Sequence, residues 1–419
     1  MEERDPMHRR RRSRTLALAA VGGMLMAACG SGDDATEASD GLVVWYYFSG
    51  GPAEALEKQH ELWAEAHPDV PVEYVQIPFE QLPSRLLATA STEDGPDVVL
   101  HNVPVDFPAL AGAGVLADLT DYWNESEVAE QLPDNAAWRS DDKVYTVMSY
   151  TNLLGLYYNQ NILDEYDLAP PESVTEFEAA MQTVAADGKY VPLAMAGAAG
   201  TAGAWNFMPL LLGRGVDYCN LEGEIVHEEF ERLQRWTEQG FVPRDTSTWI
   251  GPDAWQQFFG GDVAFGINGN WNLGDARGAE WIGTARFPAG PDGSHVFLGG
   301  EGLGIGAFSD QQDLAWEYIE TAWLSDEASL INFNTSGQIP TRTDLAEHQD
   351  LREDALVRPF VAAAGDSGAW PMNEQTAAMQ QAMGAAVSAV ISGQKSAEQA
   401  ADDVIAEVAD AREQGGSTC

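Results

Sequence analysis

The sequence has little lysine and almost no cysteine. Only Lys58, Lys143, Lys189 and Lys395 occur among its 419 residues, and 22 basic side chains face 66 acidic ones, for a formal net charge of −44. A field of that sign repels nucleic acid, anionic lipid and anionic substrates. We therefore expect no nucleic-acid partner, and we interpret the acidity as a general surface property rather than as a binding patch.

The only apolar run near the N-terminus, residues 16–26, is too short to span a bilayer, which takes about 20 apolar residues. It follows the basic stretch 8–14 and leads into LMAAC at 25–29, which resembles the lipobox of bacterial lipoproteins, with Cys29 as the lipidated residue. This order predicts a lipoprotein signal peptide over residues 1–28. An ordinary signal peptide with a chance cysteine is the alternative, and Arg11-Arg12 leaves both the Sec and the Tat export routes open.

Residues 29–40 are small, polar and acidic, which predicts a flexible tether. The chain from Gly41 onward is long enough for two domains. After cleavage before Cys29, 16 basic and 63 acidic side chains remain, for a net charge of about −47. Two further cysteines remain, Cys219 and Cys419. An exported protein can pair them, and a buried Cys219 with a loose terminal thiol is the equal alternative.

Short β-rich runs alternate with amphipathic helices, which predicts an α/β fold with a largely parallel sheet. The expected strands cover residues 42–48, 70–77, 97–101 and 263–267, with an extended run over 144–158. The expected helices cover residues 52–67, 81–91, 172–186, 228–239, 311–323, 375–392 and 396–413. Ligands of open α/β sheets bind beyond the carboxyl ends of the strands, so the residues that follow strands are candidates for a site.

Five segments, in this order, resemble the extracellular solute-binding proteins of carbohydrate ABC importers, the family that includes maltose-binding protein. They are GPDVV (95–99), NLLGLYYN (152–159), FFGGDVAFGINGNW (258–271), GGEGLGI (299–305) and GQIPTR (337–342). The similarity extends over about residues 41–408, and the joint order of the segments behind a lipobox makes it specific.

The resemblance implies a two-lobed periplasmic-binding-protein fold, similar to type II, with the ligand between the lobes. Three hinge crossings are expected near residues 149–152, 298–303 and 323–329. The N-terminal lobe would then comprise 41–149 and 303–324, the C-terminal lobe 150–298 and 329–413, and the tail 414–419. The implied function is that of the extracytoplasmic subunit that delivers a mono- or oligosaccharide to a permease. A separate ATPase subunit, a monomeric state and no cofactor or metal are expected with it.

Six candidate residues lie between residues 49 and 152. Ser49 and Gly50 follow the first strand, where a plain turn is the alternative. His101 and Asn102 end the third strand, although a lone histidine is usually structural. Tyr150 and Asn152 lie at the first crossing, where a purely structural hinge is the competing interpretation.

The stronger candidates are aromatic platforms and hydroxyl acceptors. Sugars present apolar faces and rings of hydroxyls, so their sites combine flat aromatic side chains with amides and carboxylates. The residues of this kind are Trp205 in a Gly/Ala-rich stretch, Asn270 and Trp271 after a strand, Glu301 beside Gly300, and Trp370 in a predicted loop. Most tryptophans belong to a core, which is the alternative for each of the three.

Two other functions remain as alternatives, a cell-surface lipoprotein glycosidase and a binding protein for a non-sugar solute. A glycosidase would use a pair of carboxylates, but no hydrolase motif accompanies the many acids, and we assign no catalytic residue. The sequence also contains no His-Glu-x-x-His metal motif and no P-loop. Arg342 is the only arginine in the motifs assigned to the cleft, which disfavours a phosphosugar or amino-acid ligand.

Overall fold

The computed structural model describes residues 41–368 and 370–416. The predicted signal peptide, the tether, Cys29 and Cys419 lie outside these residues. The described residues belong to one compact unit.

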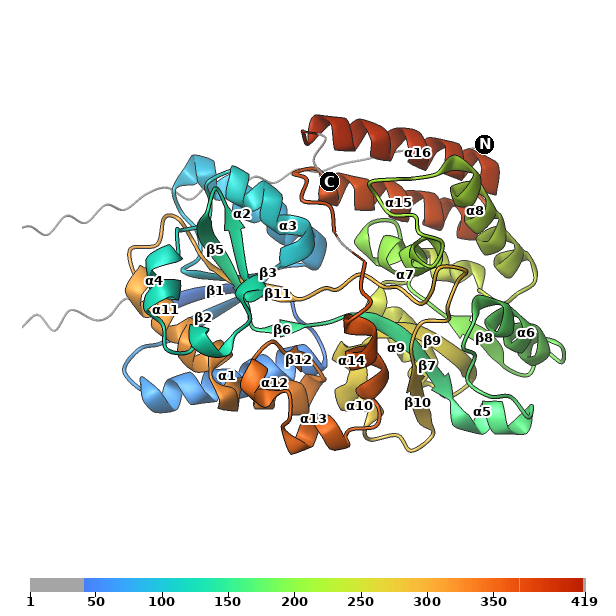
Figure 1. Ribbon diagram of the computed structural model, residues 1–419, viewed down its shortest axis with the longest axis horizontal. Helices are drawn as coiled ribbons and strands as arrows, with labels where there is room; N and C mark the ends of the chain where they lie inside the picture. The colour runs from blue at the N-terminus through green and yellow to red at the C-terminus, as the bar shows by residue number, and fades with distance from the viewer. Residues whose placement is uncertain (1–40, 369, 417–419) are drawn as a thin grey trace, which may run out of the picture. The chain divides into compact units, whose positions relative to one another are not determined.

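Three sheets organise the described chain (Figure 1). The six-stranded sheet has the order β2-β1-β3-β11-β5-β4, the four-stranded sheet β10-β7-β9-β8, and the two-stranded sheet β12-β6. We call the part built on the six-stranded sheet the first lobe and the part built on the four-stranded sheet the second lobe. The strands are β1 (Leu42–Tyr46), β2 (Val72–Gln76), β3 (Val98–Asn102), β4 (Ala137–Ser140), β5 (Lys143–Met148), β6 (Tyr150–Thr151), β7 (Leu154–Asn159), β8 (Val191–Ala194), β9 (Val263–Gly269), β10 (Ile282–Ala285), β11 (Glu301–Ile305) and β12 (Ile339–Pro340).

The α/β prediction is confirmed, but the expectation of a largely parallel sheet is wrong. Among the strand pairs of the described residues, only β1 with β2, β1 with β3, and β8 with β9 are parallel. The first sheet becomes antiparallel at β11, which pairs with both β3 and β5. The reason is topological, since β11 comes from far along the chain and is not the next strand of a local βαβ unit.

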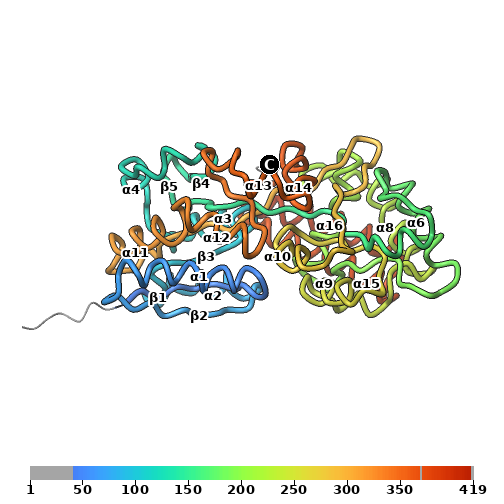
Figure 2. Tube along the Cα trace, turned by 90° about the horizontal axis from the view of Figure 1, so that it is seen from below, coloured from blue at the N-terminus to red at the C-terminus, as the bar shows by residue number. Residues whose placement is uncertain are grey.

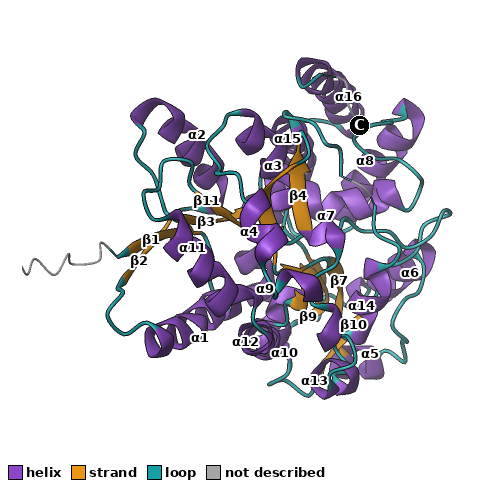
Figure 3. Cartoon of the chain, turned by 60° about the vertical axis from the view of Figure 1, so that its left-hand side comes forward, coloured by secondary structure: helices purple, strands orange, loops and turns teal. Residues whose placement is uncertain are grey.

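Helices cover the strands of both lobes (Figure 3). Those numbered up to α8 are α1 (Gly51–Ala66), α2 (Leu82–Thr92), α3 (Val103–Gly112), α4 (Thr120–Glu125), α5 (Gln160–Glu165), α6 (Val174–Ala185), α7 (Thr201–Leu212) and α8 (Gly223–Glu238). The remainder are α9 (Gly251–Phe259), α10 (Leu273–Ala276), α11 (Gln312–Ile319), α12 (Asp326–Ser336), α13 (Gln349–Glu353), α14 (Arg358–Ala364), α15 (Thr376–Ser392) and α16 (Ala397–Gln414). Among the described residues, no helix combines the length and apolarity needed to cross a membrane.

The first lobe packs helices on both faces of its sheet. On one face, Trp63 of α1 and Trp316 of α11 join the core that contains Leu100. On the other face, Leu86 of α2 and Leu110 of α3 pack against strand residues of the same sheet. The period-two pattern of the strands therefore buries side chains on both sides.

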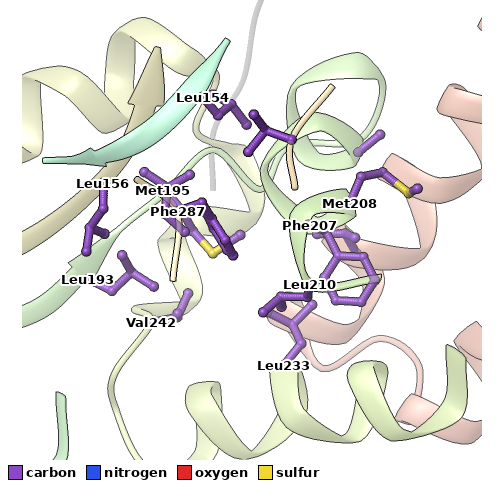
Figure 4. Packing of buried hydrophobic residues seen from close by; sticks show 14 of the residues in the cluster. Leu154, Leu156, Leu193, Met195, Phe207, Met208, Leu210, Leu233, Val242 and Phe287 are labelled. Atoms are coloured by element: carbon purple, nitrogen blue, oxygen red, sulfur yellow. The ribbon is translucent and has the colours of Figure 1, made fainter. Parts of the chain in front are cut away.

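The second lobe has the larger continuous core. Leu154 and Leu156 of β7, Leu193 of β8, and Phe207 and Met208 of α7 belong to one cluster of buried residues (Figure 4). Helix α15 is buried between α7 and α16, which explains its run of alanine, valine and methionine. Each fully buried large side chain of this kind contributes about 1.5–3 kcal/mol.

Three connecting segments lie together between the two lobes. Strand β6 pairs with β12, with Tyr150 opposite Pro340. Asn152 forms an antiparallel bridge with Gly299, in which Asn152 N–H donates to Gly299 O at 3.0 Å and Gly299 N–H donates back at 2.7 Å. The crossings predicted near residues 149–152 and 298–303 lie within these segments.

The structure has its third connecting strand at Ile339–Pro340, after α12, rather than near the predicted residues 323–329. The segment 320–324 is instead a π-helical turn, and Trp323 belongs to the core of the first lobe. Helix α12 then packs along α1, as Figure 2 shows. The predicted lobe boundary at residue 329 therefore falls inside a helix, because Asp326–Ser336 forms one continuous element capped by Ser325.

Candidate binding site between the lobes

Glu301 is at the centre of the candidate site. It is the first residue of β11 and lies opposite Asn102, the last residue of β3. Tyr47 donates its hydroxyl hydrogen to Glu301 Oε1 at 2.6 Å, and Asn152 Nδ2 donates to Oε2 at 2.9 Å. Burial raises the pKa of the Glu301 carboxyl, although the hydrogen bonds from Tyr47 and Asn152 act in the opposite direction. The first lobe and the first crossing thus meet at one carboxyl group.

Two glycines let the backbone approach this carboxyl closely. A Cβ atom on Gly299 would lie 2.3 Å from Asn152 Oδ1 and 2.5 Å from the ring of Trp205. Gly300 has φ +157°, and a Cβ atom there would lie 2.5 Å from the Tyr150 carbonyl oxygen. Any larger residue would push apart the segments that hold Glu301, which explains the two glycines that precede it.

The aromatic side of the site comes from the second lobe. Trp205 is on α7, and its ring centroid lies 5.5 Å from that of Trp370. Trp370 stacks on Phe297 at 4.0 Å and donates Nε1–H to the Leu298 carbonyl oxygen at 2.8 Å. By contrast, the Trp205 Nε1–H is buried and has no hydrogen-bond partner. Trp370 is therefore fixed by the protein, whereas Trp205 keeps a free donor at the site.

Trp271 lies on another side of the same crossing segment. The backbone N–H of the preceding residue, Asn270, donates to the Leu153 carbonyl oxygen at 3.3 Å. The half-buried Trp271 ring covers Gly269, where a Cβ atom would lie 2.0 Å from it. The start of α1 is also close, since a Cβ atom on Gly51 would lie 3.5 Å from the Trp271 carbonyl oxygen. The exposed Ser49 and Gly50, which precede α1, are thereby near this tryptophan.

The structure assigns two of the predicted contact residues to the protein interior. His101 is 0% exposed, its Nε2 is 3.0 Å from the Thr146 hydroxyl, and burial lowers its pKa to about 3. Asn270 is also 0% exposed; its Oδ1 accepts from Leu153 N–H at 2.9 Å and its Nδ2 donates to Gly337 O at 2.8 Å. Both residues lie at the end of a strand, as expected. Their side chains, however, point into the protein, and the position in the sequence does not reveal this direction.

Three groups near the site were missed by sequence reasoning. Tyr47 was counted inside the first strand, but β1 ends at Tyr46, which places Tyr47 at the sheet edge. Asp106 lies one helical turn after β3 and accepts from Asn102 N–H at 3.2 Å. Glu80 bonds to the second lobe, accepting from Thr201 N–H at 3.2 Å and from Gln381 Nε2 at 2.8 Å. Asp106 could have been found from the sequence because it lies close to the end of a strand. No sequence signal marked Glu80.

Arg342, the only arginine in the family-like segments, is bonded within the protein. It is 9% exposed, forms an ion pair with Asp344 and donates Nη1–H to the Leu324 carbonyl oxygen. Within the part of the chain that the structure describes, no group of three or more His, Cys, Asp or Glu side chains is arranged to hold a metal ion. Surface hollows beside α6, α8 and α16 contain none of the predicted site residues.

Cys219 is disulfide-bonded. Its carbonyl oxygen accepts from Arg412 near the end of α16, and Asn373 donates to the Arg412 carbonyl oxygen at 3.2 Å. Cys419 lies outside the described residues, so its pairing with Cys219 stays a prediction.

Two α/β lobes joined by three crossings, with a polar and aromatic site between them, define a solute-binding protein. The family model of bacterial extracellular solute-binding proteins matches residues 58–359, and the chain belongs to that family.

Two similar proteins carry the names of sugar-binding proteins. The diacetylchitobiose-binding protein DasA of Streptomyces coelicolor is 26% identical over 87% of this chain and 90% of its own length. The arabinooligosaccharide-binding protein of Halalkalibacterium halodurans is 25% identical over 77% of this chain and 76% of its own. The GacH receptor of Streptomyces glaucescens, solved unliganded and with acarbose, superimposes with a TM-score of 0.79 at 22% identity. That likeness covers 91% of this chain and 100% of the receptor chain, and it supports the same fold.

Proposed function

We propose that the protein is the substrate-binding subunit of an ABC sugar importer and that it holds a mono- or oligosaccharide between its lobes. The observation that carries the proposal is that the Trp205 ring lies against Gly299, two residues before Glu301, whose carboxyl is oriented by Tyr47 and Asn152. Relatives whose names specify binding of diacetylchitobiose and arabinooligosaccharides support it. These relatives are named as binding proteins, and we propose no catalytic role for the site.

The two kinds of group have separate tasks. A tryptophan platform buries about 40–60 Å² of an apolar sugar face, worth roughly 1–1.5 kcal/mol at 25 cal/mol/Å². Glu301 and the amides of Asn102 and Asn152 select the hydroxyl pattern, because an unpaired buried polar group costs about 1–3 kcal/mol. The free Nε1–H of Trp205 is a further donor for a sugar oxygen. Trp271, Ser49 and Gly50 complete the proposed contacts from the other side.

The proposal is tested by calorimetry against a panel of mono- and oligosaccharides, after a thermal-shift screen. A sugar at 100 times its dissociation constant should add about 2.7 kcal/mol of stability. Trp205→Ala should then weaken the accepted sugar at least tenfold, or about 1.4 kcal/mol. Trp281→Ala is the matched control, because Trp281 packs on Phe258 and Phe259 away from the site. Equal affinities of the two variants would contradict the assignment.

The same proposal includes the surroundings of the protein. The subunit acts outside the cytoplasm as a monomer, is held at the membrane by lipid on Cys29, and delivers its sugar to permease subunits served by a separate ATPase. Incubation with the accepted oligosaccharide should yield no cleavage product. Release of shorter sugars would favour a glycosidase instead.

A further inference from the structure

The carboxylate of Glu80 reaches from the first lobe to the second. Glu80 lies in the 3₁₀ turn Phe79–Gln81, which precedes α2. Its Oε1 accepts from the Thr201 N–H at 3.2 Å, and its Oε2 accepts from Gln381 Nε2 at 2.8 Å. Thr201 begins α7 and Gln381 belongs to α15. One side chain of the first lobe is therefore bonded to two helices of the second.

Helix α7 has no side-chain cap from its own segment. Its N-cap residue is Gly200, whose φ of +101° suits glycine and which brings no acceptor side chain. The first N–H groups of a helix have no partner within the helix and lie at the positive end of its dipole. A carboxylate stabilises both features, and here the other lobe supplies it. A Cβ atom on Gly200 would lie 3.1 Å from Glu80 Oε1, so a side chain there would crowd the contact.

Both ends of this contact are held by packing. In the first lobe, the Phe79 ring packs edge-on against the Tyr47 ring at 4.7 Å, and Tyr47 donates to Glu301. In the second lobe, a Cβ atom on Gly384 of α15 would lie 1.8 Å from the Gly200 carbonyl oxygen. Helix α15 and the start of α7 are thus in close contact, and the Glu80 carboxylate joins two packed surfaces beside the candidate site.

The contact also bears on the aromatic platform. Thr201 and Trp205 are four residues apart on α7, and residues at this spacing lie on the same face of a helix. The Trp205 ring lies against Gly299, where a Cβ atom would be 2.5 Å from it. Docking of Thr201 on Glu80 therefore fixes the start of the helix that carries Trp205 relative to the first lobe.

We propose that Glu80 is an interlobe latch, which holds the lobes closed and positions Trp205 without itself binding the sugar. Two lobes joined by short crossings move as a hinge, and bonds present in only one arrangement favour that arrangement. Because apparent affinity falls with the fraction of protein in the binding-competent arrangement, the latch changes the affinity for every accepted sugar by the same factor. The effect on affinity rests on the proposed function, whereas the effect on closure does not.

A double-mutant cycle in sugar affinity tests the latch. Calorimetry with diacetylchitobiose, arabinotriose and acarbose compares Glu80→Ala, Gln381→Ala and the double variant. Glu80→Ala should weaken each sugar that binds about threefold to tenfold, by the same factor for all. The double variant should be no weaker than Glu80→Ala, because the bond is already absent. A contact that persists in the open arrangement would lower Tm and leave the affinities unchanged.

Glu374→Ala is the matched control. Glu374 precedes α15 and is likewise an exposed carboxylate that faces the other lobe, since its Oε1 would lie 2.9 Å from a Cβ atom on Gly112 of α3. It is not part of the Glu80 contact, so this variant removes a negative charge between the lobes and keeps the latch. Thermal unfolding checks that each variant is folded.

Small-angle X-ray scattering without sugar gives a second measurement. Glu80→Ala should have a larger radius of gyration than both the unmutated protein and Glu374→Ala. An unchanged radius, or sugar affinities equal to those of Glu374→Ala, overturns the latch and leaves the proposed function standing. A loss confined to one sugar overturns it too, because it would make Glu80 a ligand contact. If no sugar binds and the radius still increases, the proposed function falls and the latch stands; if the radius is also unchanged, both fall.

Discussion

Replacing Asn270 by alanine should destabilise the protein far more than an ordinary amide deletion. The side chain is 0% exposed and joins Leu153 N–H to Gly337 O, at 2.9 Å and 2.8 Å. The variant leaves both backbone groups buried and unpaired. Each such group costs about 1–3 kcal/mol, so we expect a loss of about 2–6 kcal/mol in the free energy of unfolding.

Thermal unfolding measures this loss. For a unit of roughly 380 residues, an unfolding entropy of about 2.1 cal/mol/K per residue is close to 0.8 kcal/mol/K. A loss of about 3 kcal/mol then lowers Tm by about 4 °C. Asn334→Ala is the control, because that exposed amide also donates one hydrogen bond, to Asp350 at 2.8 Å, but water replaces it. A Tm of Asn270→Ala equal to that of the control, with sugar affinity strongly reduced, would refute the structural role and restore Asn270 as a ligand contact.

Four further outcomes are expected. Cys29→Ser should release the protein from the membrane fraction, because acyl chains are the proposed anchor; cell fractionation checks this, and retention in the membrane contradicts it. The unfolded, unreduced mature protein should show no free thiol by titration if Cys219 pairs with Cys419, whereas two free thiols rule the bridge out. Trp271→Ala should weaken the accepted sugar about tenfold in a fluorescence titration, and an unchanged dissociation constant removes it from the site. His295 faces the Asp366 and Asp292 carbonyl oxygens with its two ring nitrogens, at 2.7 Å and 2.9 Å, which raises its pKa and favours the imidazolium. The charged His295 therefore stabilises the fold fully below the unfolded pKa of about 6.5, and this stabilisation is lost as pH rises through the higher folded pKa. The difference in unfolding free energy between pH 5.5 and pH 8.5 should be smaller in His295→Asn than in the unmutated protein.

Periodicity and the family motifs predicted most of the framework from sequence. The expected helix over 396–413 is α16, and the expected strand over 263–267 is the start of β9. These elements carry regular apolar spacing and clear caps, such as Ser396 with Gln399 in α16. Helix α7 was missed because its Gly/Ala-rich start resembles a loop, although Ala204, Phe207 and Leu211 bury its face.

The sequence by itself determined the acidic, lysine-poor composition, the alternation of strands and helices, and the placement of candidate groups after strands. Only the tertiary structure decided which of those groups meet. Glu301, Tyr47 and Asn152 come from three distant parts of the chain, and their contact depends on the antiparallel insertion of β11 beside β3. Asn270 and Asn152 look alike in sequence, each in a family motif near a strand. Packing directs the first amide into protein and the second to the carboxyl at the site, because hydrogen-bond partners are fixed by three-dimensional neighbours rather than by local pattern.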